Sequence, residues 1–117
     1  MEFRFEQLLV YQKAVDLSNR IFLITKNFPS NARYSITDQL NRACLSIPLN
    51  IAEGSSRTSK DFQHFLAIAR GSCYESIPII TIAKAQKFIS EKQYEEIKLN
   101  LEEISKMLSA LRTSISK

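Results

Sequence analysis

Residues 46–59 read SIPLNIAEGSSRTS, and the way this stretch folds decides how the chain is organised. Its apolar residues belong to a series at helical spacing that begins before Pro48 and continues past it: Leu40, Cys44, Ile47 and Ile51. A proline inside a helix removes one backbone hydrogen bond, here to the carbonyl of residue 44, and bends the helix. Because the spacing is unbroken, it favours a kinked helix over a loop. Gly54 then supplies the left-handed position at which helices commonly end.

Three other segments of the chain repeat the same helical spacing. The first series is Val10, Ala14, Leu17, Ile21, Ile24 and Phe28. Pro29 follows it, and the residue before a proline avoids the α region, so this helix is expected to end at Phe28. Gly71 and Pro78 are expected to bend the helix of the next series, which is Phe62, Leu66, Ala69, Cys73, Ser76, Ile80 and Ala83. Residues 88–90 separate it from the last series, Tyr94, Ile97, Leu101, Ile104, Leu108, Leu111 and Ile115.

The predicted architecture is an all-α, antiparallel up-down-up-down four-helix bundle that forms one domain over residues 1–117. Four amphipathic helices with short connections bury their apolar stripes in this way. Two glycines and three prolines in 117 residues are too few turn residues for a many-stranded β fold. Ser35 and Ser59 are expected to be the N-caps of the second and third helices, because a serine hydroxyl accepts a free backbone N–H group there.

A second set of apolar residues lies away from these stripes. At 100° per residue, Leu45 and Leu49 point nearly opposite the core stripe of their helix. Three isoleucines of the third helix point away from its stripe, Ile68, Ile79 and Ile82, and the first helix has a further line, Leu8, Val15 and Phe22. A wide core face explains part of this pattern, but it does not explain Leu45 and Leu49. We therefore predict an interface with a second copy or with another protein, made of Leu45, Leu49, Ile68, Ile79 and Ile82.

The charge balance and the N-terminus limit the possible partners and location. The chain carries 16 Lys and Arg against 12 Asp and Glu, which gives a net charge of +4. This balance fits an ordinary, mildly basic solvated surface, and it also fits a face that binds polyanions such as nucleic acid. No apolar run approaches the roughly 20 residues that span a bilayer, so we expect no membrane contact. The first residues do not form a secretory signal, which favours a cytoplasmic location.

No set of residues in the sequence has the pattern of a catalytic or metal site. The single histidine, His64, has no Cys, Asp or Glu partner at metal-ligand spacing, and there is no Glu-x-x-His motif. Cys44 and Cys73 both fall on apolar stripes, which is typical of small buried residues rather than nucleophiles. There is no phosphate-binding glycine loop and no Ser/His/Asp set. We therefore expect no catalytic residue, no metal and no cofactor, and we expect that the protein is not an enzyme.

Two long segments carry a resemblance to a known family. LVYQKAVDLSNRIFLIT (residues 9–25) and ITDQLNRACLSIPLNIAEGSSRTSKDFQHFLAIARGSCYES (residues 36–76) resemble the two diagnostic blocks of the 23S rRNA intervening-sequence protein family of bacteria. The most specific element is SIP-x-NIAEG-x-x-R-x-S, which here runs from Ser46 to Ser59. The chain departs from the family pattern at Cys44, where alanine is common, and at Pro78, where the family has uninterrupted helical residues.

The resemblance implies a four-helix bundle that assembles into a ring-like pentamer, the form of known folds in the family. It also implies an association with RNA, because the genes of the family are associated with intervening sequences in large-subunit ribosomal RNA genes. A similar protein, the accessory variability determinant of diversity-generating retroelements, works with a reverse transcriptase and nucleic acid. Five subunits at +4 each would give a ring of +20, which would bind phosphates in a salt-dependent manner. The expected function is an RNA-associated adaptor, and the alternative is a protein-interaction scaffold that binds no nucleic acid.

Two interpretations of the proline segment remain open. In the structural one, Asn50 and Glu53 hydrogen-bond the backbone that Pro48 frees and the turn that follows, and Arg57 pairs with Glu53. In the functional one, four basic residues form a contact surface for nucleic acid or protein: Arg42, Arg57, Lys60 and Arg70.

Overall fold

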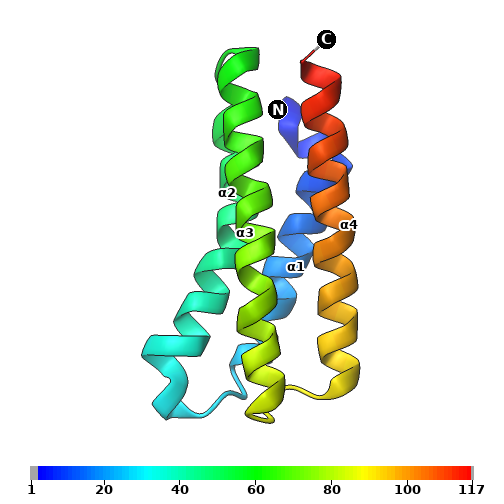
Figure 1. Cartoon of the computed structure of the whole chain (residues 1–117). Helices are drawn as coiled ribbons and strands as arrows, with labels where there is room; N and C mark the ends of the chain where they lie inside the picture. The colour runs from blue at the N-terminus through cyan, green and yellow to red at the C-terminus, as the bar shows by residue number, and fades with distance from the viewer. Residues whose placement is uncertain (1–2, 117) are drawn as a thin grey trace.

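Four long helices run alternately up and down in the computed structural model, which describes residues 3–116 (Figure 1). They are α1 (Leu9–Thr25), α2 (Asp38–Ser55), α3 (Ser59–Ala85) and α4 (Glu91–Ile115). Each helix packs against the one that follows it in the chain, and α4 closes the bundle by packing against α1. No strand occurs within residues 3–116. The all-α, up-down-up-down fold predicted from the sequence is therefore confirmed.

The helices share one hydrophobic core, and the predicted stripes line it. In α2 all four stripe residues are buried: Leu40, Cys44, Ile47 and Ile51. Along α4 the stripe is buried from Tyr94 to Leu108, while Leu111 and Ile115 are partly buried at the end of the bundle. Phe28 lies beyond α1 and still packs on the core, where its ring lies 5.3 Å from that of Phe88 between centroids. Helical spacing alone therefore identified the inward side of each helix.

The ends of the helices differ from the predictions by up to one turn. The helix α1 ends at Thr25 rather than at Phe28, and residues 26–28 form a turn. Between α1 and α2 the chain forms a short 3₁₀ helix, Ser30–Ala32, and a π-helical turn, Arg33–Thr37, which leads directly into α2. Ser35 therefore lies inside the π turn and is not an N-cap.

The N-cap of α3 is Thr58, one residue before the predicted Ser59. The Thr58 hydroxyl accepts the backbone N–H of Asp61 at 3.2 Å, and Ser59 is the first residue of the helix. Thr and Ser are both good N-caps, so the sequence alone did not separate two adjacent candidates. Gly54 is likewise not the left-handed residue that ends α2, because the helix continues through it to Ser55 and no glycine has a positive φ.

The helix α3 runs through Gly71 and Pro78 as one continuous helix (Figure 1). Pro78 is exposed, so the carbonyl that it leaves without a helical partner can bond water instead. Gly71 is also exposed, and a side chain added there would meet no atom within 4 Å. Glycine and proline therefore cost the helix little stability at these two positions, because both positions face solvent.

Two ion pairs join α1 to α4. Lys13 Nζ lies 2.6 Å from Glu103 Oε1, and Arg20 pairs with Glu96 one level further along the two helices. All four side chains are at least one-third exposed, so each pair contributes little stability on its own. The two ion pairs show that the carboxylates of Glu96 and Glu103 are turned toward α1.

Among residues 3–116, one helix is long and apolar enough to cross a membrane, on length and composition alone, and that helix is α3. The sequence-based expectation that no segment reaches this length was wrong for α3, because charged residues are sparse along it. A core helix passes the same test, and α3 packs between α2 and α4 in the bundle. This single helix is weak evidence for a membrane location.

Candidate functional surfaces around the proline segment

Pro48 is buried, and a side chain from another helix replaces the hydrogen bond that it removes. In a regular helix the carbonyl of Cys44 would accept the N–H of residue 48, which proline lacks. Ser18 Oγ of α1 donates to that carbonyl at 3.1 Å, and the bond is buried. The proline therefore creates an acceptor that holds α1 and α2 together. The prediction that Asn50 satisfies this freed backbone was wrong.

Asn50 instead belongs to a short polar network between α2 and α3. Its Nδ2 donates to the carbonyl of Ser46 at 2.8 Å and to the Ser46 hydroxyl at 2.9 Å. From α3, the Ser72 hydroxyl donates to the same Ser46 hydroxyl at 2.9 Å. Because each buried polar group here has a partner, the network fixes the register of α2 against α3. Ser46 and Ser72 carry no strong sequence signal, and their roles follow only from the contact between helices.

At Gly54 the helices α2 and α3 lie too close together for a side chain. A Cβ built on it would lie 2.6 Å from Phe65 Cβ and 2.9 Å from Phe62 Cδ1. The first of these atoms is attached to the backbone and cannot swing aside. The glycine of the SIPLNIAEG segment is therefore needed for helix packing, not for a turn.

Gly54→Ala is expected to destabilise the protein by about 1–2 kcal/mol, because overpacking of about 1–3 kcal/mol outweighs the gain in helix propensity of at most about 1 kcal/mol. Urea unfolding followed by circular dichroism measures this difference. Gly71→Ala is the matched control, since it adds the same methyl group to a helical glycine in open space. That control is expected to be neutral or stabilising. Equal effects at both glycines would contradict the packing role of Gly54.

The predicted pairing of Glu53 with Arg57 is present. Arg57 Nη2 lies 3.1 Å from Glu53 Oε2, and the guanidinium lies over the Phe65 ring at 5.4 Å from its centroid. The Glu53 side chain does not bond the turn, and it is the backbone carbonyl of Glu53 that accepts the Ser56 hydroxyl at 2.7 Å. The structural interpretation of the segment is therefore right for the ion pair and wrong for the carboxylate's contact with the turn.

The four basic candidates do not lie together on one surface. Arg42, near the start of α2, pairs with Asp38 at 3.5 Å and lines a groove that also contains Glu75. Arg57 lines a groove at the opposite end of α2, and Lys60 is exposed on the first turn of α3. Arg70 lines a third groove, between α3 and α4. A helical-wheel projection gives the side of a helix on which a residue lies, but it does not give the height of that residue along the bundle axis.

Four of the five predicted interface residues are exposed. The exposed fraction is 38% for Leu45, 58% for Leu49, 41% for Ile68 and 47% for Ile82. Ile79 is only 8% exposed and belongs to the core, so its assignment to the interface was wrong. Its side of α3 faces α2, and a helix packed between two neighbours buries a wider arc than a single stripe.

The line Leu8, Val15 and Phe22 lies on the side of α1 that packs toward α2. Ser18 bonds the carbonyl of Cys44, and Asn41 Nδ2 donates to Thr25 Oγ1 at 3.0 Å, which fixes how the two helices are aligned. Because the helices are antiparallel, this alignment places residues 15–22 at the level of residues 42–49. Phe22 is 45% exposed and Val15 is partly buried. The outer faces of α1 and α2 therefore form one apolar surface, called here the α1–α2 face, which comprises Val15, Phe22, Leu45 and Leu49.

Comparison with known proteins agrees with this geometry. The model of the 23S rRNA-intervening sequence protein family matches residues 6–110. This chain belongs to that family. A crystal structure from Bacteroides thetaiotaomicron, of a protein with unknown function from the S23 ribosomal protein family, is similar with a TM-score of 0.81 at 25% sequence identity. The similarity covers 90% of this chain and 96% of that protein. No curated protein matches the chain.

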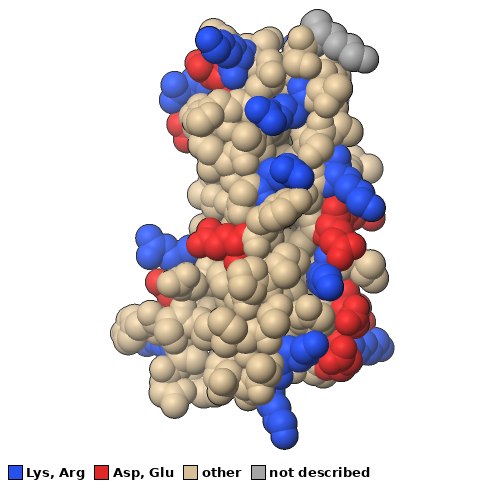
Figure 2. Space-filling view, viewed as in Figure 1, with Lys and Arg blue, Asp and Glu red and all other residues tan. Residues whose placement is uncertain are grey.

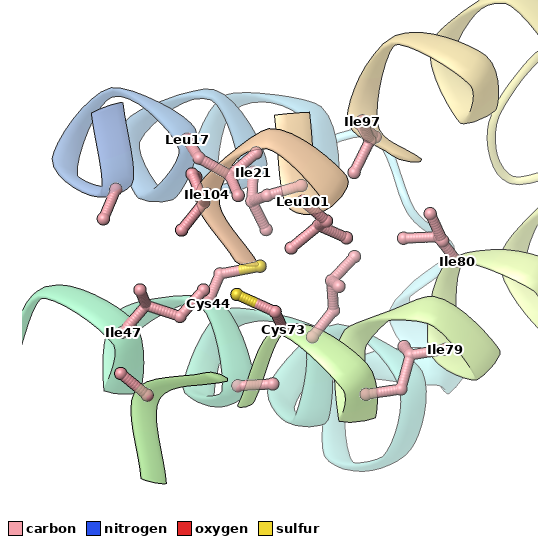
Figure 3. Packing of buried hydrophobic residues seen from close by; sticks show 14 of the residues in the cluster. Leu17, Ile21, Cys44, Ile47, Cys73, Ile79, Ile80, Ile97, Leu101 and Ile104 are labelled. Atoms are coloured by element: carbon pink, nitrogen blue, oxygen red, sulfur yellow. The ribbon is translucent and has the colours of Figure 1, made fainter. Parts of the chain in front are cut away.

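The two cysteines of this member of the intervening-sequence family are free thiols inside the core. Figure 3 shows the sulfur atoms of Cys44 and Cys73 pointing toward each other, close to Leu101 of α4. Burial raises the pKa of Cys44 to about 11, although a contact with the Ser76 hydroxyl at 3.7 Å opposes the rise. Burial, and next the proximity of Cys44, raises the pKa of Cys73 to about 12. Neutral, buried thiols are poor nucleophiles.

Both thiols are expected to resist a disulfide reagent such as DTNB at pH 8 in the folded protein and to react on unfolding.

The stability of the protein is expected to fall at high pH because of the same two thiols. In the unfolded chain each thiol loses its proton near the ordinary pKa of 9.0, whereas in the folded chain the pKa is about 11 for Cys44 and about 12 for Cys73. The free energy of unfolding is therefore unaffected by these thiols below pH 9. It falls as the pH rises toward 11–12, by about 1 kcal/mol per pH unit for each thiol. A Cys44→Ala, Cys73→Ala variant is expected to lose stability less steeply between pH 9 and 11. If the double variant loses stability as steeply with pH as the unmodified protein, the two thiols are not the groups that cause the loss.

Sequence reasoning missed two basic residues that share a groove with Arg70. Lys98 and Lys106 of α4 line the same groove between α3 and α4. Both are charged residues in a helix that is rich in Lys and Glu, so the sequence indicated only a solvated face. His64, in contrast, is exposed near Phe65, with ring centroids 6.2 Å apart. Within residues 3–116 no group of three His, Cys, Asp or Glu is placed to bind a metal ion.

Proposed function

We propose that this protein is a non-enzymatic adaptor that self-assembles, as a ring of five subunits, and associates with RNA in the cytoplasm. Membership in the 23S rRNA-intervening sequence protein family carries the proposal, since the match extends over residues 6–110. The pentamer follows from the resemblance to ring-forming members of the family. Two features of this chain support it: the exposed α1–α2 face and the net charge of +4.

The distribution of basic residues supports contact with an extended polyanion rather than with one small anion. Arg42, Lys60 and Arg70 lie at different levels and on different sides of the α2–α3 pair. A ring repeats each of these positions once per subunit, so that widely spaced charges become a continuous positive field. Such a field binds a phosphate backbone through counterion release and with little sequence preference.

The proposal is tested with a fluorescently labelled fragment of 23S rRNA in anisotropy titrations at several salt concentrations. We expect the logarithm of the affinity to fall linearly with the logarithm of the salt concentration. Lys60→Gln is expected to weaken binding and to lower the salt slope by about one unit, whereas Arg42→Gln is expected to lower it less, because Asp38 already pairs with Arg42 at 3.5 Å. Lys13→Gln is the matched control, because Glu103 already neutralises this ammonium group at 2.6 Å.

An absence of any anisotropy change at low salt, with the protein folded by circular dichroism, would overturn the RNA association. The alternative function, a protein-interaction scaffold, is favoured by the same α1–α2 face and by a groove between α3 and α4. Under that alternative the apolar face still associates, and the variants at Arg42 and Lys60 bind their partner as the unmodified protein does.

A further inference from the structure

The groove between α3 and α4 has the form of a binding site. Its volume is about 550 Å³, and its floor consists of Cys73 and Ile77 from α3 and Leu101 from α4. Along α4 its lining extends from Lys98 to Ser109, which corresponds to roughly 17 Å at 1.5 Å per residue. The groove is therefore elongated along the helix axes and has an apolar floor.

Small side chains explain why the groove is open. Ser105 and Ser109 occupy the positions of α4 that face α3 at this level, where a closely packed bundle would have larger apolar residues. Both serines are partly buried, so they lie at the contact between the helices rather than on the outer surface. The opening results from residue choice along α4 and does not require any distortion of the helices.

The charges on the rim of the groove are mostly positive. Arg70, Lys98 and Lys106 line it, with Glu102 as the single carboxylate among its lining residues. Arg70 donates to the Tyr74 hydroxyl at 2.9 Å and lies 4.8 Å from the centre of that ring, and Lys98 lies 5.8 Å from the centre of the Tyr94 ring. In the part of the chain that the structure describes, no ion pair joins any of these three cations to a carboxylate.

Three other carboxylates near this end of the bundle pair with residues outside the groove. Glu96 and Glu103 of α4 pair with residues of α1, and Glu91 lies 3.5 Å from Lys84. Figure 2 shows Lys and Arg side chains on both sides of the α3–α4 junction, with acidic side chains along the outer side of α4 and others on the α2–α3 side of the view. The apolar floor thus lies between three cations and one carboxylate, Glu102, and none of the three cations forms an ion pair with a carboxylate in the described part of the chain.

We propose that this groove binds an acidic amphipathic helix of a partner protein. The apolar face of such a helix would cover Cys73, Ile77 and Leu101, and its carboxylates would meet the cations of the rim. A groove of about 17 Å accepts about three helical turns, and helices recognised in this way present apolar residues at i, i+3, i+4 and i+7. Charge complementarity selects an acidic helix over a basic one.

A phosphate backbone fits the groove less well. Nucleic acid would leave the apolar floor without an apolar partner, and Tyr74, which could stack on a base, is already engaged with Arg70 through the hydrogen bond and the ring contact. This site is therefore distinct from the proposed RNA contact, which depends on basic residues distributed over the whole subunit, although Arg70 belongs to both sets.

The test uses three fluorescein-labelled peptides of about 12 residues with the full-length protein. The first has leucine on one helical face and glutamate on the other, the second replaces every glutamate with lysine, and the third replaces every leucine with serine. We expect the first peptide to bind, and the other two to bind at least about tenfold more weakly, because each lacks one of the two matching features. Equal binding of the acidic and basic peptides would overturn the proposal.

Variants then locate the site. Ser105→Leu fills the groove without changing any charge and is expected to abolish binding of the acidic peptide. Arg70→Gln and Lys106→Gln are each expected to weaken it about threefold to fivefold, as for exposed ion pairs. Lys92→Gln, which removes a charge from α4 outside the groove, is expected to have no effect.

Two further measurements distinguish other occupants of the groove. Light scattering is expected to give the same mass for Ser105→Leu as for the unmodified protein, and a change would assign the groove to a subunit interface and overturn the proposal. Binding of a labelled 15-nucleotide oligouridine is expected to be the same for both proteins. A loss of oligouridine binding in Ser105→Leu would assign the groove to nucleic acid and would likewise overturn the proposal.

Discussion

Replacing both Leu45 and Leu49 with serine is expected to reduce the assembly to single chains of 13.4 kDa while the bundle remains folded. Neither leucine belongs to the buried core, and their exposed fractions are 38% for Leu45 and 58% for Leu49, so the bundle is expected to tolerate the substitution. The exposed fractions of the two leucines together amount to about one leucine side chain, and burying that surface in an interface contributes about 1.5–3 kcal/mol per subunit contact. Light scattering after size-exclusion chromatography measures the mass, and circular dichroism measures the helix content.

Leu99 provides the matched control for this experiment. It is 63% exposed on α4, so Leu99→Ser removes an equally exposed leucine that does not belong to the α1–α2 face. Its mass is expected to equal that of the unmodified protein. If the double variant keeps the unmodified mass, Leu45 and Leu49 do not form the subunit contact. If the unmodified protein itself has the mass of a single chain at micromolar concentration, the proposed assembly does not form.

The parts of this fold that depend on local periodicity were predicted correctly from the sequence. The apolar stripes of α2 and α4 are buried as expected, and Pro48 lies within a continuous helix. The Glu53–Arg57 pair was also predicted, because residues four apart on a helix are neighbours whatever surrounds them. In each case the spacing along one helix contains all the information that is needed.

The errors concern contacts between helices. Ser18 lies 26 residues from Cys44, and no local rule connects a serine of one helix to a carbonyl freed in another. Ile79 was assigned to the surface because the helical-wheel argument allowed each helix only one buried side. The helix α3 has neighbours on two sides, and Ile79 is buried. The basic residues were grouped without knowledge of their levels along the bundle. The groove with Lys98 and Lys106 was missed for the same reason, since its two walls come from different helices.

The second large effect is expected at the contact between α1 and the proline segment, where Ser18→Ala should destabilise the protein by about 2 kcal/mol. The substitution leaves the carbonyl of Cys44 buried without a donor, because Pro48 has no N–H to offer it. In a Pro48→Ala background the new N–H of residue 48 bonds this carbonyl along the helix, and the same serine change should then cost about 0.5 kcal/mol or less. Urea unfolding of the four proteins in this double-mutant cycle gives the coupling directly, and we expect about 1.5 kcal/mol.

Ser76→Ala distinguishes this specific coupling from a general sensitivity of the core. Ser76 is fully buried, and its hydroxyl donates at 2.8 Å to the carbonyl of Ser72, which lies in the same helix and has a helical N–H donor as well. Its removal should cost less than the removal of Ser18, and the cost should not depend on residue 48. If Ser18→Ala costs the same with proline and with alanine at position 48, the hydrogen bond does not compensate for the proline. The proline would then be retained in α2 for the apolar contacts of its ring, and Pro48→Ala would be expected to destabilise the protein with or without Ser18.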